Sequence, residues 1–283
     1  MNALNDVPAP AKLNLFLHIV GRRADGYHLL QSAFMLIDWQ DTLHFERRPG
    51  GKIEREDLTI ALPPDDLITR AARLLQVHTG CTWGAHIAVH KAIPAQAGLG
   101  GGSSDAASCL LALNRLWGLG LSVQQLAVLG VQLGADVPFF LYGHNAWVEG
   151  IGEKITPIQL PPAQFVVIKP DVGLETAKIF AHPDLRRDTK AATLDGLART
   201  SYDFGHNDLQ AVAEQICPPV SHAIKRLAAQ GLQGKMTGSG SAVFALLPQG
   251  QIWQQDPDLA NCQVRVCSNL AVHPLSGWAT SDN

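Results

Sequence analysis

The sequence predicts an α+β fold, because segments with strand patterns and segments with helix patterns follow one another irregularly along the chain. Strand segments show alternating apolar residues, and helical segments show apolar residues spaced three and four positions apart. The chain has 283 residues, of which 46% are hydrophobic and 17% are charged. This composition is globular, and a chain of this length can bury a large core as one domain or two.

The first strand is predicted at residues 11–20, where apolar side chains alternate. Leu13 and Leu15 fall on one face of this strand, and Lys12 and Asn14 fall on the other. A lysine on the polar face of a strand is ordinarily solvated. The strand is therefore expected to have one apolar and one polar face, with Lys12 as a candidate functional residue on the polar one.

The remaining elements of the first half follow from the same patterns. An Asp25-Gly26 turn closes the first strand. Strands are predicted at residues 41–48 and 84–91, and helices at residues 65–78, 106–117 and 122–135. The last of these helices must stop near Asp136, because Pro138 forces its neighbour out of the helical conformation.

The second half begins after an expected boundary at the proline-rich residues 160–164. Strands are predicted at residues 166–170, 241–248 and 263–274, and helices at residues 207–216 and 220–231. Strands and helices do not alternate regularly here either. This order favours α+β over a doubly wound parallel sheet.

Residues 98–102 contain four glycines, and a helix follows with Ser103, Ser104 and Asp105 as its N-cap and first-turn residues. Glycine loses more conformational entropy on folding than any other residue, so a run of it indicates that side chains would obstruct something. A helix N-terminus offers unpaired backbone N–H groups and a partial positive charge, both of which favour phosphate. We therefore expect a phosphate-binding loop, with a flexible turn as the alternative.

Three common glycine motifs do not fit this loop. A Walker loop requires a lysine after its last glycine, and Gly102 is followed by Ser103. In the dinucleotide fingerprint, Ser103 would take the place of the third glycine. In the hydrolase elbow GxSxG centred on Ser103, Asp105 would take the place of the second glycine.

A second small-residue turn, KMTGSGSAVFAL at residues 235–246, has backbone N–H groups and hydroxyls to offer the same phosphate. A plain hairpin turn is the alternative. Asp136 lies among apolar residues at a helix end, where a capping or turn role is the ordinary explanation. The residues alone thus predict a phosphate-binding α+β protein with a candidate lysine and a candidate carboxylate, and they do not reach a reaction.

Charge and apolar runs exclude several partners. The net charge is -3 without a run of like charges, which indicates no nucleic-acid partner. The apolar run LFLHIV is far shorter than the roughly 20 residues of a membrane span, and no signal-peptide pattern precedes it. The five cysteines form no CxxC pair and indicate neither a zinc site nor a disulfide framework. We expect a cytoplasmic protein that acts on a small molecule.

Three segments together resemble the GHMP kinases, the superfamily named for galactokinase, homoserine kinase, mevalonate kinase and phosphomevalonate kinase. These segments are PAKLNLFL at residues 10–17, GLGGGSSDAA at residues 98–107 and KMTGSGSAVF at residues 235–244, in the order found in the family. The resemblance implies an N-terminal ATP-binding domain at residues 1–160, a C-terminal domain at residues 161–283, and an active site in the cleft between them.

Two longer segments are similar to the signatures of one branch of this superfamily, which acts in the non-mevalonate route to isoprenoid precursors. They are PAKLNLFLHIVGRRADGYHLLQS and LGADVPFFLYG. The branch implies ATP-dependent phosphorylation of a hydroxyl on a small molecule that carries cytidine diphosphate, with Mg²⁺ as cofactor, by a monomer or a homodimer. The likeness covers most of the chain.

Site residues follow from the resemblance, position by position. Asp136 matches the catalytic aspartate that accepts the proton of the substrate hydroxyl, and Lys12 the lysine that orients and polarises it. The residues expected at ATP are Lys91, Gly98, Leu99, Gly100, Gly101, Gly102, Ser103 and Ser104, with the Ser104 hydroxyl near Mg²⁺. The residues expected at the substrate are Asn14, Tyr27, His28, Asp136, Thr176 and Phe180, of which Tyr27, His28 and Phe180 hold the cytosine.

Two positions depart from the family pattern, and two other functions remain open. Asp66 stands where an asparagine is expected near the adenine, and Gln96 where a small residue is frequent. A superfamily kinase acting on homoserine or mevalonate is one alternative, but it gives no reason for the ADGYH segment. A nucleotide-binding regulator without turnover is the other, and the presence of both Lys12 and Asp136 argues against it.

Overall fold

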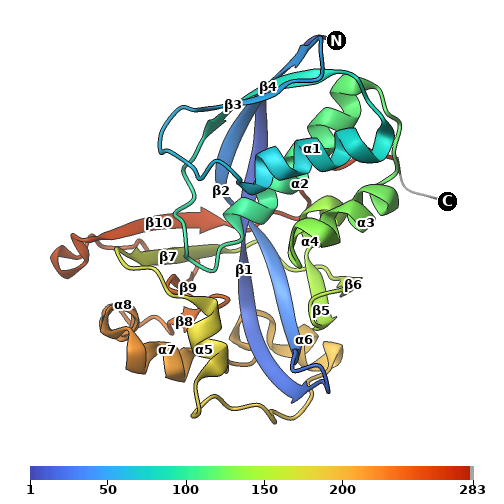
Figure 1. The fold of residues 1–283 in the computed structure, drawn as a ribbon. Helices are drawn as coiled ribbons and strands as arrows, with labels where there is room; N and C mark the ends of the chain where they lie inside the picture. The colour runs from blue at the N-terminus through green and yellow to red at the C-terminus, as the bar shows by residue number, and fades with distance from the viewer. Residues whose placement is uncertain (281–283) are drawn as a thin grey trace.

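The computed structural model describes residues 1–280, which form two β-sheets with helices packed against them (Figure 1). The larger sheet has the strand order β3-β4-β2-β5-β6, with β1 paired to β2. Its strand pairs are antiparallel except for β3 with β4. The strands are β1 (Ala3–Arg22), β2 (His28–Arg48), β3 (Ile53–Asp57), β4 (Gly84–His90), β5 (Ala146–Gly150) and β6 (Lys154–Pro157).

The smaller sheet is antiparallel and has the strand order β10-β7-β9-β8. Its strands are β7 (Gln164–Pro170), β8 (Lys235–Met236), β9 (Val243–Leu247) and β10 (Cys262–Ser268). The sheets therefore separate between residues 157 and 164, next to the predicted boundary. Largely antiparallel sheets with separate groups of helices make the fold α+β.

Helices gather in two groups along the long β1–β2 ribbon (Figure 1). One group is α1 (Leu67–Thr79), α2 (Gly101–Trp117), α3 (Val123–Leu133) and α4 (Val137–Tyr142). The other elements are α5 (Thr176–Ala181), α6 (Leu194–Thr200), α7 (Gln210–Ile216), α8 (Pro218–Ala229) and the 3₁₀ turns at Ser201–Asp203 and Pro257–Leu259. In the part of the chain that the structure describes, no helix is both long and apolar enough to cross a bilayer.

The β1–β2 ribbon contributes to the core of both halves of the molecule. Ala9 and Leu36 pack with helices α1 to α4, whereas Leu17 and Ile19 pack with α7, α8 and the smaller sheet. A third cluster between them joins Phe16 of β1 to residues of β2, β7 and β9. The division into domains at residue 160 stays a prediction, since this ribbon runs through both halves.

The expectation of a polar, solvated face on the first strand is wrong. Residues 9–19 of β1 are buried on both faces, and Lys12 and Asn14 are 4% and 2% exposed. Alternation shows which side chains share a face, but it does not show what covers each face. A segment from the second half of the chain covers the polar face, because the Thr237 hydroxyl accepts a hydrogen bond from the Asn14 N–H.

The start of α2 differs from the expectation, and a short helix for which there was no expectation follows α3. Helix α2 begins at Gly101, and its N-cap is Gly100 at φ 73° rather than a serine. Helix α3 ends at Leu133, and a separate short helix, α4, begins at Val137. Pro138 lies in the first turn of α4, where a missing N–H costs nothing, and Asp136 is its N-cap.

Candidate functional site

The glycine-rich loop lies between β1 and the second small-residue turn. Gly98 and Gly100 have φ values of 71° and 73°, a conformation that favours glycine. The Leu99 carbonyl accepts a hydrogen bond of 2.9 Å from the Lys12 N–H, which ties the loop to β1. The free N–H groups at the start of α2 therefore follow directly after a segment whose position is fixed.

The two small-residue segments pack backbone against backbone. A Cβ atom on Gly98 would lie 2.2 Å from the Thr237 carbonyl oxygen and 3.1 Å from the Gly240 nitrogen. The N–H groups of Ser241 and Ala242 donate to the carbonyls of Gln96 and Ala97, each at 3.2 Å. Gly98 is thus required by the packing of the protein itself, whereas a Cβ on Gly102 would meet only Leu67, at 3.4 Å.

Gly98→Ala is expected to lower the free energy of unfolding by about 1 to 3 kcal/mol and to weaken ATP binding, since it combines positive φ with a backbone clash. Gly102→Ala is the matched control. It should leave stability equal or slightly higher, because alanine favours helix, and should weaken only the binding of ATP phosphates. Urea unfolding and calorimetry with ATP separate the two effects. A Gly98→Ala protein as stable as wild type contradicts this packing argument.

A cavity of about 690 Å³ opens along the glycine-rich loop, and we call it the nucleotide cavity. Apolar residues from the first half line one side of it, and the start of α5 and the second turn line the other. Of the residues predicted at ATP, it is lined by Lys91, Gly98, Leu99, Gly100, Gly101, Gly102 and Ser103. Ser104 is fully buried behind this lining, so its predicted contact with a metal ion stays a prediction.

Lys91 lines the nucleotide cavity and forms ion pairs with two aspartates of the protein. Its side chain is 8% exposed, and its ammonium forms ion pairs with Asp41 and Asp105. Burial raises the pKa of the Asp105 carboxyl, and the neighbouring Asp41 adds to this shift against the opposing effect of Lys91. Lys91, which directly follows β4, therefore joins Asp105 of α2 to Asp41 of β2. Neither aspartate partner was identified from the sequence, because they lie 50 and 14 residues from Lys91.

The two departures from the family pattern have structural reasons. Asp66 is the N-cap of α1, accepts hydrogen bonds from the N–H groups of Ile68 and Thr69, and pairs with Arg55. Its charge is compensated within the protein, although it also lines the nucleotide cavity. Gln96 has φ 50°, and its side chain fills the space that a Cβ on Gly173 would need.

A second cavity, of about 240 Å³, lies on the other side of the glycine-rich loop, and we call it the acceptor cavity. Lys12, Asn14 and Asp136 line it together with Thr176 and Phe180. Four residues line both this cavity and the nucleotide cavity, namely Gly98, Gly100, Thr176 and Ser239. The two cavities therefore meet at the glycine-rich loop.

Lys12 and Asp136 approach each other in the acceptor cavity from distant parts of the chain. The Lys12 Nζ lies 3.6 Å from Asp136 Oδ2, donates to the Asn14 side-chain oxygen, and lies 4.8 Å from the centre of the Phe34 ring. Burial lowers the pKa of the Lys12 ammonium, and Asp136 partly opposes this shift. Asp136 is the more open partner, with 31% of its side chain exposed, so its carboxylate is accessible to a ligand.

The residues predicted at the cytosine lie at the end of the β1–β2 ribbon. The rings of His28 and Phe180 are 5.0 Å apart at an angle of 32°. Phe180 lines the acceptor cavity, and Tyr27 is 62% exposed beside the Asp25-Gly26 turn. Thr176 hydrogen-bonds Ser239 at 2.6 Å. The structure thus brings His28 to Phe180, while Tyr27 and His28 line neither of the two cavities.

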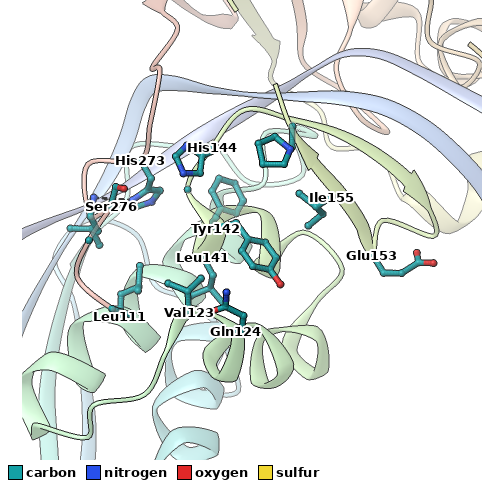
Figure 2. A pocket seen from close by; sticks show the side chains of 17 residues that line it. Leu111, Val123, Gln124, Leu141, Tyr142, His144, Glu153, Ile155, His273 and Ser276 are labelled. Atoms are coloured by element: carbon teal, nitrogen blue, oxygen red, sulfur yellow. Dashed lines mark hydrogen bonds between the residues drawn. The ribbon is translucent and has the colours of Figure 1, made fainter. Parts of the chain in front are cut away.

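A further cavity of about 620 Å³ lies away from all the predicted site residues (Figure 2). It is lined by the end of α4, by α3, by the β5–β6 hairpin and by residues after β10, including the buried His273. His273 Nδ1 accepts the Leu275 N–H at 3.1 Å, and its buried Nε2 has no hydrogen-bond partner among residues 1–280. Burial lowers the pKa of His273 to about 4.

The free energy of unfolding is expected to fall between about pH 6.5 and pH 4 because of His273. The unfolded chain takes up a proton near the usual pKa of 6.5, whereas the folded chain keeps His273 neutral down to about 4. Acidification over this window therefore favours unfolding, by up to about 3 kcal/mol. Urea unfolding at several pH values should show a smaller decline in His273→Asn, which keeps an acceptor for Leu275. Equal declines in both proteins contradict this.

Two family models match the chain. One is described as GHMP kinases N terminal domain and matches residues 66–144, and the other as GHMP kinases C terminal and matches residues 185–269. Among solved structures, the crystal structure of a 4-(cytidine 5'-diphospho)-2C-methyl-D-erythritol kinase is similar with a TM-score of 0.76 and 33% identity, over 93% of this chain and 98% of that one.

A homoserine kinase from Cytophaga hutchinsonii has a TM-score of 0.68 at 16% identity, over 96% of both chains, which shows the fold alone.

Full-length relatives carry the same kinase name. The 4-diphosphocytidyl-2-C-methyl-D-erythritol kinase of Variovorax paradoxus strain S110 is 62% identical over 99% of this chain and 100% of its own. That of Acidovorax sp. strain JS42 is 62% identical over 98% of this chain and 99% of its own. The similarity therefore extends through both sheets and both groups of helices.

Proposed function

Because the chain belongs to the 4-diphosphocytidyl-2-C-methyl-D-erythritol kinases of the GHMP superfamily, we infer that it phosphorylates the 2-hydroxyl of 4-diphosphocytidyl-2-C-methyl-D-erythritol with ATP. The observation that carries this inference is the position of the Lys12–Asp136 pair. It lies in a cavity that meets the nucleotide cavity at Gly98 and Gly100. A hydroxyl held beside Asp136 and a phosphate held on the loop would be neighbours.

Asp136 is assigned the role of general base. Its carboxylate is accessible in the acceptor cavity and can accept the proton of the attacking hydroxyl. Phosphoryl transfer leaves little covalent chemistry to the protein, so positioning the hydroxyl and the phosphate supplies most of the catalysis. Asn14 fits a positioning role, because its side-chain amide donates to the Ser32 hydroxyl and its side-chain oxygen accepts from Lys12.

Lys12 is assigned the role of holding Asp136 in place and of stabilising negative charge on the oxygens during transfer. Its side chain is 5% exposed, and a charge away from water acts more strongly on a developing charge than it would in solvent. Phe34 and Asn14 fix its position from two other sides. A preorganised cation costs no reorganisation at the moment of reaction.

The start of α2 is assigned to the ATP phosphates, with oxygen donors suited to Mg²⁺ nearby. Ser104 Oγ and Asp105 Oδ1 are buried and have no hydrogen-bond partner within the described chain. A hydroxyl and a carboxylate oxygen are the donors that Mg²⁺ prefers, so these residues fit the ion. When bound, Mg²⁺ would neutralise charge on the phosphates of ATP. The residues at the loop would hold the phosphates by backbone N–H groups.

His28, Phe180 and Tyr27 are assigned to the cytosine. An aromatic face accepts any flat base, and stacking contributes about 1 to 3 kcal/mol per base. The choice among bases then requires hydrogen bonds to the base edge, for which His28 is the polar candidate. The open Tyr27 ring lies at the same end of the ribbon.

A steady-state assay with four acceptors tests this function. We expect ATP consumption with 4-diphosphocytidyl-2-C-methyl-D-erythritol, strong discrimination against its uridine analogue, and little activity on mevalonate or homoserine. Mass spectrometry of the product should place the new phosphate on the 2-hydroxyl. If kcat/KM for mevalonate or homoserine is comparable, the substrate assignment is wrong and only membership of the superfamily remains. If ATP binds but no acceptor is phosphorylated, the protein is better explained as a nucleotide-binding regulator.

A further inference from the structure

Arg187 contacts both the His28 ring and the backbone of the segment that carries Phe180. Its Nε donates to His28 Nε2 at 3.2 Å. Its two terminal nitrogens are held in turn, because Nη1 donates to the Leu185 carbonyl and Nη2 donates to the carbonyls of Phe180 and His182. One side chain thus connects the histidine to the segment that carries its aromatic partner, Phe180.

The contact with Arg187 decides which nitrogen of His28 carries the proton. A guanidinium has only donors and does not lose its proton in proteins. His28 Nε2 must therefore accept, and in the neutral ring the proton then resides on Nδ1. Burial lowers the pKa of His28, and the charges of Arg187 and Arg22 lower it further. Among residues 1–280, the His28 side chain forms a hydrogen bond through Nε2 alone, so Nδ1 is free to donate to a ligand.

The ring contact with Phe180 connects His28 to the acceptor cavity. The His28 and Phe180 rings are 5.0 Å apart, and Phe180 lines the acceptor cavity with Lys12 and Asp136. Cytosine has an acceptor at N3, whereas uracil has an N–H at the same position. An Nδ1–H group therefore pairs with cytosine N3 and would face a second donor in uracil, leaving both groups unsatisfied.

We propose that Arg187 is a specificity-positioning residue, which fixes the proton of His28 on Nδ1 and so makes the enzyme select cytosine over uracil. This proposal rests on the function inferred above. It assigns to Arg187 no contact with the substrate, since Arg187 acts through His28. It also predicts that the selecting state exists in the free enzyme, before any ligand binds.

The first test measures the proton position in the free enzyme by NMR of protein labelled with ¹⁵N-histidine, using His28→Gln to assign the signal. We expect a protonated Nδ1 and an unprotonated Nε2 for His28 in wild type. In Arg187→Leu the signal should move toward a mixture of both tautomers. If NMR shows the His28 proton on Nε2 in the wild-type enzyme, the proposal is overturned. This result requires no variant and does not depend on whether the assigned reaction occurs.

The second test compares kcat/KM for 4-diphosphocytidyl-2-C-methyl-D-erythritol with that for its uridine analogue. Arg187→Leu should lose at least about tenfold of the preference for cytosine, with KM for ATP unchanged. Arg186→Leu is the matched control, because Arg186 is the neighbouring cation, has a side chain that is 62% exposed, and forms an ion pair with the exposed Asp188. It should keep the wild-type preference.

The outcomes separate the two proposals. If the wild-type enzyme does not phosphorylate the cytidine substrate, the proposed function is contradicted. The NMR measurement still tests the position of the His28 proton independently of that result. Turnover with an unchanged preference in a folded Arg187→Leu enzyme overturns the role of Arg187. If Arg187→Leu does not fold, Arg187→Lys replaces it, since lysine keeps the charge and loses the planar set of donors.

Discussion

Replacement of Asp136 by asparagine is expected to lower kcat by about 10²- to 10⁴-fold, the usual contribution of a positioned general base. Asparagine keeps the shape of the side chain and an oxygen for Lys12, but it cannot take a proton at neutral pH. KM for ATP should stay close to that of wild type, because Asp136 lines the acceptor cavity and not the nucleotide cavity. Steady-state kinetics at saturating acceptor measure both quantities.

The control for this variant is Asp195→Asn, an equal loss of charge at an exposed residue that lines neither cavity. It should have wild-type kinetics. Calorimetry with ATP shows whether the nucleotide still binds when turnover is lost. A folded Asp136→Asn enzyme with kcat within a few-fold of wild type would remove the assignment of Asp136 as the base.

Lys12→Met is expected to lower kcat by about 10²- to 10³-fold without a loss of stability. The catalytic loss follows from removing a preorganised cation beside the reacting oxygens. Methionine fills a similar volume, and it avoids the free-energy cost of keeping the Lys12 ammonium away from water. Asp136 retains contact with solvent, so its charge is not left buried without a partner.

Thermal unfolding together with kinetics distinguishes this role from a purely structural one. Lys52→Met serves as the control, because Lys52 is 75% exposed and pairs with Glu54 far from the site. It should change neither property. If Lys12→Met lowers Tm and leaves kcat unchanged, Lys12 has a structural role on β1 and not a catalytic one.

Much of the fold follows from local patterns in the sequence. The helix at residues 65–78 is observed as α1 and begins one residue after Asp66, its side-chain cap. The strand at residues 84–91 is observed as β4, and the Asp25-Gly26 turn is observed with Gly26 at φ 91°. Periodicity and turn residues suffice in these places, because each signal arises from residues that are neighbours in the chain.

The phosphate-binding character of the glycine-rich loop was also predicted from residues that are neighbours in the chain. Glycine permits the positive φ that Gly98 and Gly100 adopt, and the start of any helix leaves N–H groups free, whichever fold surrounds them. The sequence therefore predicted phosphate binding, although it gave the wrong residue as the helix cap. It did not reveal that Gly98 is required by the Thr237 carbonyl, since this partner lies 139 residues away.

The sequence by itself determined the α+β class, the glycine-rich loop at the start of a helix, and the motifs by which the kinase family is recognised. Only the tertiary structure decided that the polar face of β1 is buried, that Lys12 meets Asp136 at 3.6 Å, and that Arg187 donates to His28. The reason is physical. Local patterns report which side chains share a face, but burial and charge pairing depend on which distant segment covers that face.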